Sequence, residues 1–380
     1  MLLTVFSILA ATLVLPPIAY YLWMKNKGRV AWGFERNRDY QPKVTLVIAT
    51  YNEAAVIRRK LENVQNLDYP EEKLQVIVVD SNSSDGTLKT AKDFLATETF
   101  RFPIRLISEK ERLGKSHALN TALEFAEGEI IATSDADSYW DEKALLNAVS
   151  YLADPSVGAI TGHEKITNLE KSVHTMSEGI YLRFYYILRL GESKIHSTFI
   201  FNGGLSMYRR SSFEKFEDRP GYSDDVGTVI NMVSSGYRCI FVPDAIFYDT
   251  AAHSLKGRLT LKSRRSQHLI AGIIQSIRFK ISGKFLLPWS VVFFNFYLHV
   301  LSPLIAFSTL FIAIAVFAVY FQILWFLLPL LFIALLFKKL RLFTISYLTS
   351  NVALIIGLMH HFTKRRSMSW RKVDEMRSGV

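Results

Sequence analysis

A long stretch without any charged side chain limits the possible folds of this chain more than any other feature. Residues 285–337 contain no Asp, Glu, Lys or Arg, and residues 2–24 and 342–359 form two further uncharged blocks. Apolar runs of about 18 residues or more are typical of membrane-spanning helices. We therefore expect an N-terminal membrane helix at residues 1–24 and C-terminal membrane helices within residues 285–362.

The N-terminal block has two interpretations, a retained anchor or a cleaved signal peptide. No basic segment precedes its long apolar core, whereas Lys25, Lys27 and Arg29 follow it. Basic residues remain on the cytoplasmic side of a span. The pattern thus favours a retained anchor in the cell membrane, and we expect a multi-pass protein whose next domain is cytoplasmic.

The C-terminal block leaves the number of spans open. Residues 285–337 are long enough for two spans, and we expect a kink at Pro303 and a break near residues 320–322. A last span near residues 342–362 would place the basic tail, residues 363–380, outside, against the positive-inside rule. Either the last segment does not fully cross, or the count differs by one.

The formal net charge of +11 fits a membrane protein. Basic residues beside spans contact anionic headgroups, and a basic site suits a phosphate-rich substrate. No helix-turn-helix, RNA-binding signature or zinc spacing is present, so we expect no nucleic-acid partner. The single cysteine, Cys239, excludes internal disulfides and a cysteine-based zinc site.

Residues 41–255 have the pattern of a separate α/β domain. Apolar runs at residues 44–49, 74–79 and 104–108 indicate buried strands, and a helical pattern covers residues 53–67. Strands that alternate with helices indicate a doubly wound, mostly parallel sheet. In such sheets ligands bind beyond the carboxyl ends of the strands.

Acidic residues stand at those carboxyl ends. Glu53 and Asp80 follow the first two strands, and Asp135-Ala136-Asp137 follows the apolar run 128–134. Residues i and i+2 of an extended segment point to the same side, so Asp135 and Asp137 can reach one Mg²⁺ or Mn²⁺ that bridges to substrate phosphates. A solvated loop or a helix cap is the alternative.

Several motifs together resemble glycosyltransferase family 2. They are Ala49-Thr50-Tyr51-Asn52-Glu53, the stretch VVDSNSSDGT at residues 78–87, Arg112-Leu113-Gly114-Lys115, and Asp135-Ala136-Asp137 at the place of the metal-binding pair. The resemblance covers residues 43–250. With its membrane segments the chain resembles the cellulose synthase and hyaluronan synthase branch, and within it the minimal archaeal membrane mannosyltransferases of lipid-linked glycan assembly. It implies the glycosyltransferase A-type fold of nucleotide-diphospho-sugar transferases, with an amphipathic interface helix at residues 256–284.

The resemblance also implies which residues bind the donor sugar nucleotide and the metal. Tyr51 and Glu53 are expected at the base or ribose, Asp80 at the base, Asp135 at the ribose or diphosphate, and Asp137 on the metal. The remaining donor-binding candidates are Thr50, Lys115, Arg264, Arg265 and His268. A divalent cation offsets the charge that grows on the leaving nucleoside diphosphate. Glu53 as a helix-start acid and Lys115 as a surface lysine are the plain alternatives.

On the acceptor side, residues 201–210 resemble the family's glycine segment, which implies that Asn202, Gly203 and Gly204 contact the acceptor; an ordinary tight turn is the alternative. The pair Asp224-Asp225 precedes Gly-Tyr-Arg at residues 236–238. In the family the second acid of this pair is the general base, which takes a proton from the acceptor hydroxyl during inverting transfer. Asp224 is a catalytic partner or a helix start.

Residues 262–269 depart from the synthase branch. The polymer synthases carry Gln-x-x-Arg-Trp on the interface helix, and here His268 and Leu269 replace the Arg-Trp pair. The tryptophan stacks on the growing chain, so its absence favours a single transfer over processive synthesis. Arg264 and Arg265 are expected to clamp the diphosphate, and the segment can also be a basic helix on the membrane surface.

The sequence therefore predicts a metal-dependent, inverting membrane glycosyltransferase that moves one hexose to a polyprenyl (dolichyl)-linked glycan. GDP-mannose is the favoured donor, from the archaeal likeness alone, and UDP-glucose and UDP-N-acetylglucosamine remain open. The alternatives are a processive polysaccharide synthase that uses a UDP-sugar, and a non-catalytic membrane partner, which the intact acids disfavour. No Gly-x-Gly-x-x-Gly follows the first strand, which excludes a dinucleotide-dependent dehydrogenase. The choice between Mg²⁺ and Mn²⁺ and the oligomeric state stay open.

Overall fold

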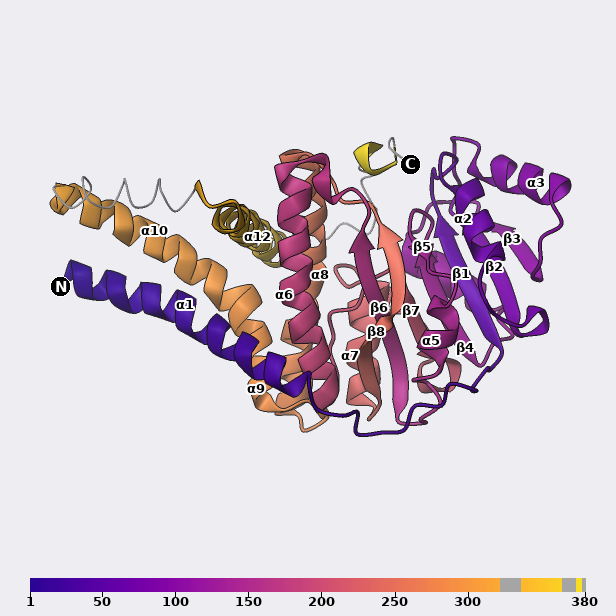
Figure 1. Cartoon of the computed structure of the whole chain (residues 1–380), viewed down its shortest axis with the longest axis horizontal. Helices are drawn as coiled ribbons and strands as arrows, with labels where there is room; N and C mark the ends of the chain where they lie inside the picture. Colours follow the sequence, from indigo (N-terminus) through magenta and orange to yellow (C-terminus); the bar gives the residue numbers. More distant parts are fainter. Residues whose placement is uncertain (322–335, 364–373, 378–380) are drawn as a thin grey trace.

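The computed structural model describes residues 1–321, 336–363 and 374–377. Figure 1 shows a sheet domain on one side and apolar helices on the other, with two long helices standing between them. These two are α6 (Val173–Ile195) and α8 (Leu255–Ile281). A helix, α8, is present where the interface helix is expected at residues 256–284, and its place at a membrane interface stays a prediction. No sequence pattern above pointed to α6.

The described residues form one eight-stranded sheet in the order β3-β2-β1-β4-β7-β6-β8-β5. Its strands are β1 (Val44–Thr50), β2 (Leu74–Asp80), β3 (Ile104–Ser108), β4 (Ile130–Asp135), β5 (Tyr139–Trp140), β6 (Val157–Ile166), β7 (Ser206–Arg209) and β8 (Arg238–Asp249). The pairs among β3, β2, β1 and β4 are parallel, as is the pair of β6 with β8. β7 is antiparallel to both of its neighbours, and β5 is antiparallel to β8. The predicted mostly parallel α/β fold is confirmed.

Helices cover both faces of the sheet, because the strands alternate apolar side chains between two cores. Val44, Leu46 and Ile48 of β1 pack with α2 (Ile57–Gln65), α3 (Thr87–Thr97) and α5 (Ala144–Val149). Val47 faces the other way, toward a core built from α4 (Lys115–Leu123) and α7 (Asp224–Ser234). Burial on both faces explains why these strands read as continuous apolar runs.

The helix expected over residues 53–67 begins later, at Ile57. The preceding backbone is instead held by side chains of the loop after β2. The N–H groups of Asn52, Glu53 and Ala54 donate to Ser83 Oγ, Thr87 Oγ1 and Asp85 Oδ2 at 2.8, 2.7 and 3.1 Å. These bonds fix the β1–α2 loop against the next βα loop, at the rim where ligands of such sheets bind.

Among the described residues, three helices are long and apolar enough to cross a membrane: Leu2–Lys27, Trp289–Val319 and Lys338–Phe362. The second comprises α9 (Trp289–Phe296), a π-helical turn (Tyr297–Leu301) and α10 (Ser302–Val319). The π turn ends at Leu301, two residues before Pro303, whose missing N–H leaves the preceding turn one donor short. The kink expected at Pro303 stays a prediction.

The break expected near residues 320–322 agrees with the end of α10 at Val319. The second span expected within residues 285–337 falls largely on residues 322–335, outside the described residues, as does most of the basic tail. The number of spans and their orientation therefore stay predictions. α1 (Leu2–Lys27) packs on α6, where Tyr20 Oη donates to buried Glu192 at 2.6 Å.

Candidate active site

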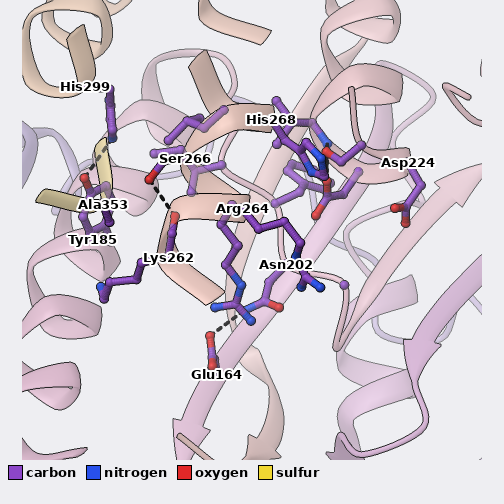
Figure 2. A pocket seen from close by; sticks show the side chains of 18 of the residues that line it. Glu164, Tyr185, Asn202, Asp224, Lys262, Arg264, Ser266, His268, His299 and Ala353 are labelled. Carbon is purple, nitrogen blue, oxygen red and sulfur yellow. Dashed lines mark hydrogen bonds between the residues drawn. The ribbon is translucent and has the colours of Figure 1, made fainter. Parts of the chain in front are cut away.

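A cavity of about 220 Å³ lies between the sheet rim and the helices α6, α7, α8 and α12 (Lys338–Phe362). Figure 2 shows its length: Asp224 and His268 lie at one end, and Tyr185, His299 and Ala353 at the other. The cavity is lined by most of the acceptor-side and phosphate-side candidates, namely Lys115, Asp135, Asn202, Gly203, Asp224, Asp225, Arg264, Arg265 and His268.

A second cavity, of about 40 Å³, lies over the carboxyl ends of β1 and β4. It is lined by the other donor-side candidates Thr50, Tyr51, Glu53 and Asp137, together with Ser81 and Arg112. Lys115 and Asp135 line both cavities, so the two spaces meet at this pair. Candidates from six distant stretches of the chain are thereby brought to one place.

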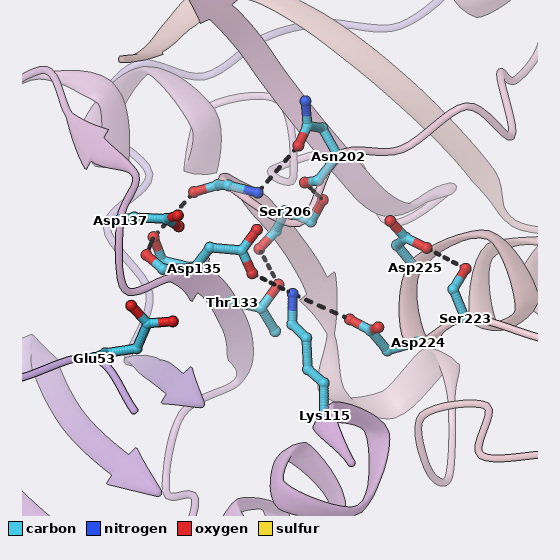
Figure 3. Close-up of polar contacts among 12 residues, drawn as sticks. Glu53, Lys115, Thr133, Asp135, Asp137, Asn202, Ser206, Ser223, Asp224 and Asp225 are labelled. Atoms are coloured by element: carbon cyan, nitrogen blue, oxygen red, sulfur yellow. Dashed lines mark hydrogen bonds and ion pairs between the residues drawn. The ribbon is translucent and has the colours of Figure 1, made fainter. Parts of the chain in front are cut away.

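Lys115 forms the electrostatic centre of this meeting point. It begins α4, and its Nζ lies 2.6 Å from Asp135 Oδ1 and 3.5 Å from Asp224 Oδ2 (Figure 3). Burial alone would raise the pKa of Asp135, but the Lys115 ammonium outweighs burial and holds that pKa below its ordinary value. For Asp224 burial prevails over Lys115 and raises its pKa to about 6.

Asp225 has a different environment, at the N-terminus of α7. Its Oδ1 accepts hydrogen bonds from the Val226 N–H at 2.7 Å and from the Ser223 hydroxyl. Within the described ranges no hydrogen bond reaches its Oδ2, although the side chain lines the cavity. One carboxylate oxygen is thus held by the helix start and the other is available to a ligand.

Asp137 and Glu53 are held by a residue for which the sequence gave no signal, Arg377. Its Nε and Nη2 donate to the two oxygens of Glu53 at 2.5 Å each, and Nη2 lies 3.3 Å from Asp137 Oδ2. The C-terminal residues are fixed there by Glu375, which accepts from Ser254 Oγ at 2.9 Å. The end of the chain therefore reaches the donor side of the rim.

The carboxylates at this rim suit a divalent cation only in part. Asp135 and Asp137 supply the hard oxygens that Mg²⁺ and Mn²⁺ prefer. Over the described ranges, however, no group of three or more His, Cys, Asp or Glu residues is placed to hold a metal. Both carboxylates also face a cation of the protein, Lys115 and Arg377. The residues fit an ion that takes its further oxygens from a bound diphosphate.

Asp80 lies just behind the smaller cavity and is 3% exposed. It accepts from Thr50 Oγ1 at 3.2 Å, from the Ser83 N–H at 3.0 Å and from Ser83 Oγ at 2.5 Å. These bonds make it the organiser of the loop after β2. Nearer the opening, the Arg112 guanidinium lies 3.6 Å from the centre of the Tyr51 ring, a contact that the motif Arg-Leu-Gly-Lys alone did not suggest.

Three candidates come from α8. Arg265 is exposed to the cavity, where Glu164 and Asp249 outweigh burial and raise its pKa. Burial and the neighbouring Arg265 lower the pKa of Arg264. Burial also lowers the pKa of His268 to about 4, against the charge of Asp225, so this imidazole is neutral at physiological pH.

The glycine segment serves the packing of the site itself. A Cβ on Gly203 would lie 2.6 Å from Lys115 Nζ and 3.0 Å from Asp135 Oδ2, and one on Gly204 would lie 2.3 Å from the Phe247 ring. Asn202 donates to Glu164 through its amide. Glycine is thus needed here for the Lys115–Asp135 pair, while the acceptor contact stays a prediction.

A buried lysine supports the strand end that carries the two aspartates. Lys60 of α2 is fully buried and donates to Ser134 Oγ at 2.6 Å and to the Ser138 carbonyl at 2.5 Å. Burial lowers its pKa to about 7, against the charges of Asp135 and Asp137. The sequence contained a sign that Lys60 is buried, because this lysine lies on the apolar face of an amphipathic helix.

Comparison with known proteins shows which family this chain belongs to. Residues 45–216 match the family model described as Glycosyl transferase family 2. The structure titled "Mannosyltransferase PcManGT from Pyrobaculum calidifontis in complex with GDP-Man and Mn2+" is 31% identical, with a TM-score of 0.83, and the match covers 96% of this chain and 100% of that chain. The chain belongs to glycosyltransferase family 2.

Two curated relatives of this glycosyltransferase have different named activities. The Beta-monoglucosyldiacylglycerol synthase of Trichormus variabilis is 35% identical over 38% of this chain and 32% of its own length. The Poly-beta-1,6-N-acetyl-D-glucosamine synthase of Staphylococcus epidermidis is 22% identical over 65% of this chain and 60% of its own length. Family membership therefore establishes a nucleotide-sugar glycosyltransferase and leaves its sugar and acceptor to further argument.

Proposed function

We propose that this glycosyltransferase moves one hexose from a nucleotide diphosphate sugar to a glycan on a polyprenyl lipid, with inversion at the anomeric carbon. The observation that carries the proposal is the larger cavity. It joins Asp135 and Asp225 at one end to Ser350 and Leu354 of α12 at the other, and α12 is one of the helices that could cross a membrane. A lipid-linked acceptor needs such a passage.

GDP-mannose is the proposed donor and Mn²⁺ or Mg²⁺ the proposed metal. The support is the 31% identical mannosyltransferase structure, which is a complex with GDP-Man and Mn²⁺. The nucleotide would lie in the smaller cavity beside Tyr51, and Asp135 and Asp137 would hold the metal. When bound, the metal offsets the charge that develops on the departing diphosphate. Arg264 and Arg265 would add charge-assisted hydrogen bonds to the same group.

Asp225 is the proposed general base. Its free Oδ2 is available to the acceptor hydroxyl, whereas Asp224 is tied to Lys115. The proposed role of Asp224 is to hold Lys115, and through it Asp135, in place. Asn202 is the proposed acceptor contact, because it lines the cavity between these acids and α6. The protein is proposed to be multi-pass, with this domain in the cytoplasm.

A processive synthase is the second candidate, which the similarity to poly-N-acetylglucosamine synthases favours. Leu269 lines the cavity where the polymer synthases place tryptophan, but Tyr181 and Tyr185 of α6 supply aromatic rings to the same space. Aromatic rings of this kind can stack on a sugar in either reaction. Product length after incubation with excess donor separates them, since a single transfer yields one added hexose per acceptor.

The donor and the base can be tested together on the full-length protein in detergent. A thermal-shift panel of GDP and UDP, with and without Mn²⁺, should show stabilisation by GDP that depends on the metal. Asp225→Asn should abolish transfer and leave this GDP shift unchanged. Asp218→Asn, at an acid that pairs with Lys215 outside both cavities, is the matched control. Stabilisation by UDP alone would refute the mannosyl donor, and wild-type turnover in Asp225→Asn would refute the base.

A further inference from the structure

Arg189 of α6 is a buried cation whose guanidinium has no hydrogen-bond partner among the described residues. The residue is 4% exposed, and the described residues give its guanidinium no hydrogen-bond acceptor; its Nε in particular is buried and unpartnered. Its recorded contact is the face of Phe241, 4.4 Å from the guanidinium carbon to the ring centre. A guanidinium has five N–H donors, and burying them unpaired is costly. Because Arg189 lines the larger cavity, an anionic ligand there would supply the missing acceptors.

A second buried cation, Lys262, lines the same cavity as Arg189. Lys262 and Arg258 of α8 are both buried and share one acid, Glu178, at 3.2 and 3.0 Å. The carboxylic acids whose charges act on Arg189 are Glu164 and Glu192, and burial raises the pKa of both. Lys262 and Arg258 thus share one carboxylate, and within the described ranges no ion pair reaches the Arg189 guanidinium.

This cationic region belongs to the membrane side of the cavity. The residues Glu178, Tyr181, Tyr185 and Arg189 recur every three or four positions of α6 and therefore share one face of the helix. Tyr185 Oη lies 2.8 Å from Nε2 of His299, in the apolar helix that follows α8, and Figure 2 shows this pair at the end of the cavity away from Asp224.

Arg189 and Arg264 are influenced by different acids. The acids whose charges act on Arg264 are Asp135, Asp225 and Asp224, at the sheet rim. Those that act on Arg189 are Glu164, Tyr181 and Glu192, all on or facing α6. Glu164 and Asp135 both act on Arg265, so this arginine lies between the two groups of acids, and Glu164 is shared by Arg265 and Arg189.

We infer that Arg189, assisted by Lys262, binds the phosphate that joins the acceptor glycan to its lipid. The inference rests on the proposed function and names the acceptor subsite of the same cavity. With the phosphate at Arg189, the lipid tail leaves toward α12 and the sugar extends toward Asp225. Arg189 then distinguishes a phosphate-linked lipid from a neutral glycolipid, because only the former supplies a charged acceptor for its N–H groups.

The test measures binding without turnover, on the full-length protein in detergent. Farnesyl phosphate and farnesol have the same tail and differ in the phosphate. The wild type should bind farnesyl phosphate about tenfold or more tighter than farnesol, since a charge-assisted contact contributes about 1.5–3 kcal/mol. Arg189→Gln should remove this preference, and Lys262→Gln should reduce it. Arg183→Gln, at an exposed arginine of the same helix, should keep it.

The competing outcomes are distinguishable. A preference for the phosphate that persists in both Arg189→Gln and Lys262→Gln would overturn the inference, as would equal binding of the two lipids by the wild type. Loss of the GDP thermal shift in Arg189→Gln would assign the residue to the donor instead.

Inorganic phosphate should not displace farnesyl phosphate at equal concentration; if it does, the site binds free phosphate. A wild type that binds farnesyl phosphate through Arg189 but transfers no sugar would refute the proposed function and leave this subsite standing. If Arg189→Gln does not fold, Lys262→Gln decides alone, because Glu178 keeps Arg258 as a partner.

Discussion

Replacing Arg377 with glutamine is expected to raise the affinity of the donor-free enzyme for Mn²⁺. Arg377 joins Glu53 through two hydrogen bonds and lies 3.3 Å from Asp137, and all three side chains are less than one fifth exposed. A cation that binds Asp137 must take over a carboxylate that already has a positive partner. Glutamine keeps a donor for Glu53 and removes the charge.

The magnitude follows from the contact that has to be given up. Arg377 can keep its bonds to Glu53, so only the longer contact with Asp137 is lost, and a partly buried charged contact of this kind contributes about 1–2 kcal/mol. The dissociation constant of Mn²⁺ should therefore fall about 5- to 30-fold in the Arg377→Gln protein. Because Asp135 remains paired with Lys115, binding should still be weak without a nucleotide diphosphate.

The assay is titration of Mn²⁺ followed by the electron paramagnetic resonance signal of the free ion. Arg58→Gln removes the same charge from an exposed pair with Glu62 and is the matched control. Glu375→Gln, which loosens the anchor of the C-terminal segment, should change the affinity in the same direction by less. An unchanged affinity in Arg377→Gln would refute the contact with Asp137 in solution, and a lower affinity would make Arg377 part of the binding site.

Three further changes test the packing and charge of the rim. Gly203→Ala places a methyl group 2.6 Å from Lys115 Nζ, so kcat should fall about tenfold or more while the melting temperature changes little. An unchanged kcat would show that the Lys115–Asp135 pair tolerates displacement. Gly204→Ala meets the Phe247 ring at 2.3 Å and should instead lower stability by about 1–3 kcal/mol, measured by thermal denaturation. The pKa of Asp224 is raised to about 6 by burial, so the folded state binds its proton more tightly than the unfolded state, and stability from this group is present at low pH and lost as the pH rises toward 6. In Asp224→Asn this loss, up to about 3 kcal/mol, should be absent between pH 4 and 6, and melting curves of wild type and variant that run parallel with pH would contradict it.

Local patterns identified the parallel half of the sheet. The strands expected at residues 44–49, 74–79 and 104–108 are present, and their ends agree within one residue. A strand that is buried on both faces needs a continuous run of apolar residues, and such a run is visible in the sequence itself. The predicted start of α2 was wrong because it depends on contacts that are distant in the sequence. Its first turn is replaced by hydrogen bonds to side chains of the next βα loop, about 30 positions away. No local propensity carries that information.

The sequence by itself determined the membrane segments, the strand ends and the acids that stand on them, because each depends on residues that are neighbours along the chain. Only the tertiary structure decided what faces those acids. Arg377 meets Glu53 across 324 positions, and Arg189 is an ordinary arginine on a helix until the fold buries it against Phe241 of β8. Electrostatic partners act through space, so a charged residue that pairs across the fold has the same local pattern as one that faces water.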